Sequence, residues 1–83
     1  MSTSPDTART AHRADDRIVT MLSQWLARHV DDAELRRGVE AIGTDELSDV
    51  QAEAVRELLA ELGADRGQNE MLVRETLEAL ALG

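Results

Sequence analysis

Four acidic residues recur at every fourth position in the second half of the chain: Asp49, Glu53, Glu57 and Glu61. Residues four apart lie on the same face of an α-helix, so this spacing predicts one continuous acidic ridge. Like charges at this spacing weaken a helix slightly, and Arg56 is the only cation between them. The acidic ridge is therefore either a solvated face or a surface that binds a positively charged protein. We take its four residues as the candidate partner-binding site.

Other residue types that carry out catalysis or bind metals are scarce. The chain has no Cys, which excludes disulfides and thiolate metal sites. Of its two His residues, His12 lies in a polar segment, whereas His29 is either a base or metal ligand beside Asp31 or Asp32, or a half-buried ring at a helix end. The loop at residues 63–70 lacks the alternating ligands of a calcium-binding EF-hand loop. We therefore expect no catalytic activity, no cofactor and no metal.

The net charge of −8 is concentrated in the second half of the chain. Residues 1–37 contain six Arg and six acidic residues, whereas residues 38–83 contain three Arg and eleven acidic residues. This charge repels nucleic-acid phosphates and anionic lipids, so we expect a protein partner with a basic patch, no nucleic acid and no membrane. The longest apolar run, residues 79–82, is too short to span a bilayer, and residues 1–13 lack the apolar core of a secretion signal. We expect a cytoplasmic protein.

The pattern of apolar residues predicts helices and no strands. Residues 1–13 are polar and without periodicity, which predicts a disordered tail, followed by one domain at 14–83. Short connections between helices favour antiparallel neighbours, so the predicted fold class is all-α, a small antiparallel three- to four-helix bundle. Apolar residues recur at helical spacing over four segments: residues 14–30, 32–42, 49–62 and 66–82.

Capping signals mark several helix ends. Gly43 is expected to end the second helix in the left-handed conformation that glycine readily adopts, and Gly63 is expected to stop the third helix. Residues 44–47 are expected to form a turn or a short lead-in to the third helix. In three places a capping residue precedes Glu or Gln by three positions, the spacing of a capping box: Asp31 with Glu34, Ser48 with Gln51, and Asp65 with Gln68.

Two features bear on packing and association. Trp25 is the only aromatic residue, and its helical spacing from Ile18 and Leu22 favours a core anchor over an interface hot spot. The fourth helix is apolar over more of its surface than an edge helix needs, so it either lies centrally or contributes to a homodimer. Its predicted inner face consists of Leu72, Val73, Leu77 and Leu80, with Met71 and Leu82 outside it.

Ser48 precedes the acidic third helix in the sequence Glu-Leu-Ser-Asp-Val. In length, acidity, helical content and the position of this serine, the chain resembles the acyl and peptidyl carrier proteins. That resemblance implies attachment of phosphopantetheine to Ser48. The chain differs from the family's Asp-Ser-Leu motif on both sides of the serine, where it has Leu47 and Asp49. A helix cap is the other role that the sequence offers Ser48.

Together these features predict a small acidic helical protein-protein interaction or regulatory module with no catalytic activity of its own. The alternative is a carrier-like protein modified at Ser48. A third option is an accessory subunit or regulator whose apolar surplus is covered by a different chain.

Overall fold

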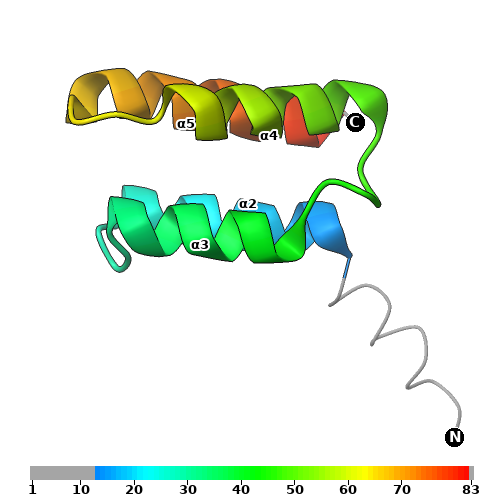
Figure 1. Cartoon of the computed structure of the whole chain (residues 1–83), viewed down its shortest axis with the longest axis horizontal. Coiled ribbons are helices and arrows are strands. Elements are labelled where there is room, and N and C mark those ends of the chain that lie inside the picture. Colours follow the sequence, from blue (N-terminus) through cyan, green and yellow to red (C-terminus); the bar gives the residue numbers. More distant parts are fainter. Residues whose placement is uncertain (1–12, 83) are drawn as a thin grey trace, which may run out of the picture.

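The computed structural model describes residues 13–82, and these residues form four α-helices (Figure 1). Of the predicted tail, residues 1–12 lie outside the described part. The observed bounds are α2 at Ala14–Leu26, α3 at Asp32–Ile42, α4 at Asp49–Glu61 and α5 at Arg66–Leu82. The predicted all-α antiparallel bundle is confirmed, and no strand occurs within residues 13–82.

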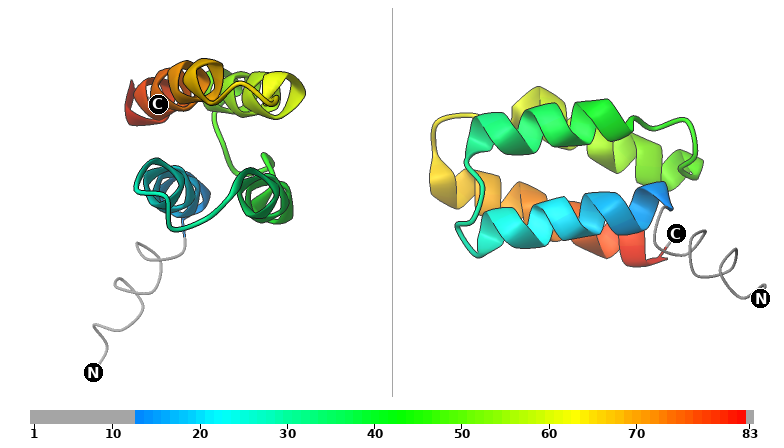
Figure 2. Two further views of the ribbon diagram at one scale, coloured as in Figure 1. Left: turned by 90° about the vertical axis from the view of Figure 1, so that its left-hand side faces the viewer. Right: turned by 90° about the horizontal axis from the view of Figure 1, so that it is seen from below.

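The helices are arranged as two antiparallel hairpins, α2/α3 and α4/α5, stacked in two layers (Figures 1 and 2). In the end-on view of Figure 2 the four helices occupy the corners of a square, with α2 next to α5 and α3 next to α4. Packing is closest within each hairpin and between α2 and α5. Between α3 and α4, Arg36 donates to the carbonyl oxygens of Leu59, at 2.9 Å, and Leu62, at 3.3 Å.

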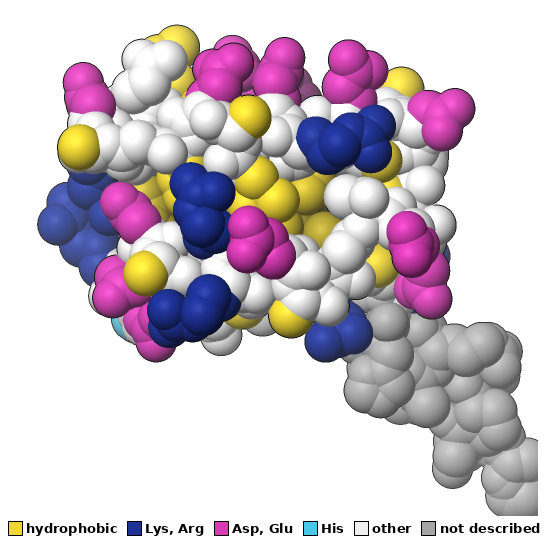
Figure 3. Space-filling model, viewed as in Figure 1, with side chains coloured by type: hydrophobic (Ala, Val, Ile, Leu, Met, Phe, Trp, Pro, Cys, Tyr) yellow, Lys and Arg dark blue, Asp and Glu magenta, His cyan; other side chains and the backbone are white. Residues whose placement is uncertain are grey.

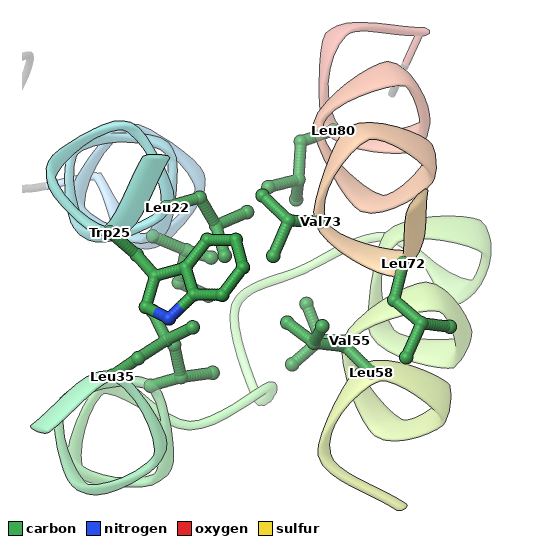
Figure 4. Packing of buried hydrophobic residues seen from close by; sticks show 10 residues of the cluster. Leu22, Trp25, Leu35, Val55, Leu58, Leu72, Val73 and Leu80 are labelled. Atoms are coloured by element: carbon green, nitrogen blue, oxygen red, sulfur yellow. The ribbon is translucent and has the colours of Figure 1, made fainter. Parts of the chain in front are cut away.

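The space between the hairpins is filled by side chains from all four helices (Figure 4). Trp25 is fully buried there, beside Leu22 of its own helix and Leu35 of α3, and faces Val73 of α5. The interpretation of Trp25 as a core anchor is confirmed. Truncating a buried Trp to Ala costs about 3–5 kcal/mol, so this one ring is a large part of the stability of so small a core.

Two predicted capping boxes form as expected. At α3 the Glu34 N–H donates to Asp31 Oδ1 at 2.8 Å, and the Asp31 N–H donates to Glu34 Oε1 at 3.0 Å. At α4 the Gln51 N–H donates to Ser48 Oγ at 3.2 Å, and the Ser48 N–H donates to Gln51 Oε1 at 3.0 Å. At α5 the Asp65 carboxylate accepts from the Gln68 N–H at 3.3 Å. These contacts are local in sequence, which is why spacing alone predicted them.

Helix α2 ends four positions earlier than predicted, at Leu26. The His29 N–H donates to the Gln24 carbonyl at 2.8 Å, and the Arg28 N–H donates to the Trp25 carbonyl at 3.0 Å. This Schellman motif needs a left-handed residue, here Arg28 with φ of 67°. Because glycine usually fills that position, an arginine there does not indicate a helix end. His29 lies outside the helix and is exposed, so the expectation of a half-buried ring at the helix end is wrong.

The two glycines expected to end helices behave differently. Gly43 follows α3 with φ of 78° and ψ of −179°, a region open essentially to glycine alone. Helix α4 ends at Glu61, one residue before the predicted end, and Leu62 follows in an extended conformation before Gly63. Gly63 does not have the positive φ that Gly43 has. Instead Asn69 of α5 binds Gly63 twice: the Gly63 N–H donates to Oδ1 at 3.0 Å, and Nδ2 donates to the Gly63 carbonyl at 2.8 Å.

Candidate protein-binding surface

The acidic ridge lies on the outward side of α4. Gln51, Ala52, Val55 and Leu58 are buried and fix the rotation of the helix about its axis. At 100° per residue, the four ridge residues then face away from the core over about three turns. All of them are exposed: Asp49, Glu53, Glu57 and Glu61. None of them forms an ion pair with any residue in the described range 13–82.

Helix α5 adds two carboxylates to the same outer face of the α4/α5 hairpin. Glu75 and Glu78 are exposed, and Glu75 lies opposite Glu57 across the seam between the helices. Sequence reasoning missed this contribution because the two acids are more than ten residues from the ridge. Only the antiparallel packing of α4 on α5 brings them to it.

A shallow groove of about 210 Å³ follows the seam between α4 and α5. Two of its residues are the alanines Ala54 and Ala79, which leave the seam open. Thr76 contributes no unpaired hydroxyl, because its Oγ1 donates to the Leu72 carbonyl at 2.8 Å. The groove is lined by Ala54, Glu57, Leu58, Leu72, Glu75, Thr76 and Ala79.

Large exposed hydrophobic side chains gather on the same two helices. Among the described residues they are Val50 at 61% exposure, Met71 at 59% and Leu82 at 82%. Helical spacing places all three on the outer side of the α4/α5 hairpin. Figure 3 shows this face from its edge, along the top of the molecule, where carboxylates and hydrophobic side chains lie side by side. The prediction that Met71 and Leu82 fall outside the core-facing side of the fourth helix is confirmed.

Both ends of this hairpin are fixed by buried amide side chains. At one end Gln51 Nε2 donates to the Leu80 carbonyl at 3.0 Å, one of the last carbonyls of α5, which lack partners within the helix. At the other end Asn69 holds the Gly63 backbone. The relative position of α4 and α5 is therefore set by hydrogen bonds as well as by packing, and the outer face has a defined shape.

A second groove lies on the outer side of the α2/α3 hairpin. Its volume is about 740 Å³, and Gly38 leaves room there for the side chain of Met21. Its charged residues are of both signs, Asp16 and Arg17, so it lacks the single-sign charge of the α4/α5 face.

The remaining sequence candidates are not brought together. Ser48 is exposed at the start of α4 and serves as its cap, and His29 lies in the exposed turn after α2. Within residues 13–82 no three His, Asp or Glu side chains are grouped closely enough to hold a metal ion. None of the described helices is both long and apolar enough to cross a membrane.

The structure thus defines a small all-α protein of two stacked helical hairpins, one of which has an acidic outer face with exposed apolar side chains. Comparison with known proteins adds no relative: no family model matches the chain, and no curated protein or solved structure is detectably similar to it.

Proposed function

We propose that the chain is a cytoplasmic protein-interaction or regulatory module without catalytic activity of its own. Its acidic ridge binds a protein partner that carries a basic patch. The observation that carries this proposal is that the ridge is exposed over its full length and has no ion-pair partner among residues 13–82.

The energetics of the free protein support the proposal. The ridge contains three like-charge pairs at i, i+4: Asp49 with Glu53, Glu53 with Glu57, and Glu57 with Glu61. Each such pair destabilises a helix by roughly 0.2–0.5 kcal/mol. A basic partner turns this repulsion into attraction, and charge complementarity speeds the encounter and excludes acidic competitors. A surface selected for stability alone would interleave cations at these positions.

Affinity capture from a native lysate tests the proposal. The wild-type chain is compared with the variant Glu53→Gln/Glu57→Gln/Glu61→Gln. The matched control, Glu40→Gln/Asp45→Asn/Glu46→Gln, removes the same charge from exposed residues away from the ridge. We expect a partner that wild type and control retain and that the ridge variant loses. Its affinity for wild type should fall at least tenfold between about 0.05 and 0.5 M salt, because exposed charges are screened. If all three proteins retained the partner equally, the ridge would be a solvated surface that does not bind it.

A second candidate function is a carrier modified at Ser48. The observation that favours it is that Ser48 is exposed at the N-terminus of an acidic helix. Incubation with a phosphopantetheinyl transferase and coenzyme A, followed by intact mass measurement, tests it. A mass gain that Ser48→Ala abolishes would establish this function, and an unchanged mass would eliminate it.

A further inference from the structure

We infer that the element which binds this protein is a basic amphipathic α-helix, and that it lies along the seam between α4 and α5. This inference rests on the proposed function, since it takes the acidic ridge to be a binding surface. It adds the type of partner element and a second, apolar half of the site.

Exposed apolar side chains lie at both ends of the α4/α5 hairpin. Val50 near the start of α4 and Leu82 at the end of α5 lie at the same end, because the Gln51–Leu80 hydrogen bond joins those helix ends. Met71, near the beginning of α5, lies toward the other end. The groove runs between them, and the small side chains of its seam allow another backbone to approach closely. An exposed apolar strip with a polar rim is typical of a protein-binding surface.

The rim selects the charge of the partner. Glu57 and Glu75 line the groove from its two sides. Glu53 and Glu61 are exposed one turn before and after Glu57 on α4, and Glu78 is exposed about one turn after Glu75 on α5. A second copy of the same face would place carboxylates against carboxylates, so charge disfavours a homodimer through this surface. A helix with an apolar stripe flanked by Lys or Arg matches both the groove and its rim.

The length of the outer face suits a helix. The segment from Val50 to Glu61 of α4 rises about 16 Å at 1.5 Å per residue, which corresponds to three turns of a partner helix, and the groove occupies the middle of this length. The seam between two packed helices accepts the side-chain ridge of a third, the mode in which amphipathic helices bind helical grooves. At about 210 Å³ the groove is smaller than the roughly 300–1,000 Å³ of small-molecule pockets, so it fits side chains of a partner rather than a free ligand.

Two synthetic peptides serve as probes against the full-length chain. The first is a 14-residue Leu/Lys helix with Leu at i, i+3, i+4 and i+7 spacing, and the second has the same composition with Leu distributed around the helix. Binding is measured by calorimetry, and the site is mapped by amide chemical shifts. The groove variant is Ala79→Gln, which fills the seam. Its control is Ala81→Gln on the same helix, where the side chain is exposed.

We expect the amphipathic peptide to bind at least tenfold more tightly than its isomer, with the largest shifts around Val50, Ala54 and Met71. Ala79→Gln should weaken the affinity for the amphipathic peptide about tenfold, and Ala81→Gln should leave this affinity unchanged. Failure of the amphipathic peptide to bind overturns the inference. The inference is also overturned if both peptides bind equally tightly and Ala79→Gln does not change their affinities. It is overturned as well if the chain self-associates and Ala79→Gln abolishes that self-association.

The two proposals fail separately. If the ridge variant loses its lysate partner while the groove variant keeps it, the ridge binds proteins but the groove inference is wrong. If the ridge variant also keeps the partner, and binds both peptides at least as tightly as wild type does, both proposals are wrong.

Discussion

Trp25 is held by polar contacts as well as by burial. Its Nε1–H donates to Asp32 Oδ1, at 2.6 Å, in a charge-assisted hydrogen bond. Above its ring lies the Arg66 guanidinium, 4.1 Å from the ring centroid, which also donates to the Trp25 carbonyl at 3.2 Å. Arg66 Nε is 3.5 Å from a Glu70 carboxylate oxygen. One side chain of α2 is thereby joined to α3 and α5, so the indole connects the two hairpins.

Asp32→Ala should therefore destabilise the protein by about 2 kcal/mol, because the indole N–H loses its acceptor while the ring stays buried. Asp32→Asn keeps an acceptor oxygen and should cost less than half as much. Urea unfolding followed by Trp25 fluorescence measures both values. Equal losses from the two variants would show that the charge at the start of α3, rather than the hydrogen bond, stabilises the fold.

Arg28 occupies a conformation that strains any residue with a Cβ. Arg28→Gly should stabilise the protein by about 0.5–1 kcal/mol, since the left-handed strain of about 1–2 kcal/mol exceeds the entropy that glycine loses on folding. Arg17→Gly, an exposed change of the same charge within α2, should instead destabilise it by about 0.8 kcal/mol. Thermal melts of the two variants should shift in opposite directions. A fall in the melting temperature of Arg28→Gly would show that the left-handed conformation of Arg28 does not destabilise the protein.

At the scale of the elements, the junction between α4 and α5 depends on one buried amide. The Asn69 side chain is 1% exposed and uses both its acceptor and its donor on the Gly63 backbone. This contact pairs the N–H and the carbonyl of Gly63, in place of the bonds that a left-handed glycine would have made at the end of α4.

Asn69→Asp should cost about 2–4 kcal/mol. The carboxylate can still accept from the Gly63 N–H, but it leaves the Gly63 carbonyl without a donor and buries a charge. Gln68→Glu, an adjacent exposed change of the same kind, should cost less than 0.5 kcal/mol. Chemical denaturation compares the two variants. Amide hydrogen exchange at residues 58–64 locates the effect, because protection should fall there first. Similar losses from both variants would show that Asn69 has no special role.

On the scale of the whole molecule, charge is distributed unequally between the hairpins. The α4/α5 hairpin, residues 49–82, contains eight acidic residues and three Arg, so it accounts for −5 of the net charge of −8. The basic residues of the chain lie mostly before it, and Arg66 is occupied at Trp25. One layer of the bundle is thus strongly anionic, and the other is nearly balanced.

Neutralising the acidic ridge should therefore stabilise the free protein even if it removes binding. Glu53→Gln/Glu57→Gln/Glu61→Gln removes all three i, i+4 repulsions and should add about 0.6–1.5 kcal/mol to the free energy of unfolding at low salt. The gain should shrink at 1 M salt, where the Debye length is about 3 Å. Thermal denaturation at both salt concentrations measures this. The control Glu40→Gln/Asp45→Asn/Glu46→Gln should add less, and equal gains from both variants would point to overall charge instead of the ridge.

Features that depend on neighbours within a few positions could be predicted from the amino-acid sequence. The two capping boxes, the turn at residues 44–47, the exposure of the ridge and the burial of Trp25 were all predicted correctly. Helical periodicity fixes which side of each helix is apolar, and capping depends on residues three apart, so both are legible without a structure.

Contacts between residues far apart in the chain could not be predicted in this way and depend on how the helices pack. Arg28 ends α2 against its own preference because the bonds of the Schellman motif and the burial of α2 outweigh the strain. Asn69 replaces Gly63 as the determinant of the α4 end, and Glu75 joins the acidic ridge across a groove. These outcomes arise from contacts between segments, and such contacts depend on how the helices pack rather than on the spacing of residues along the chain.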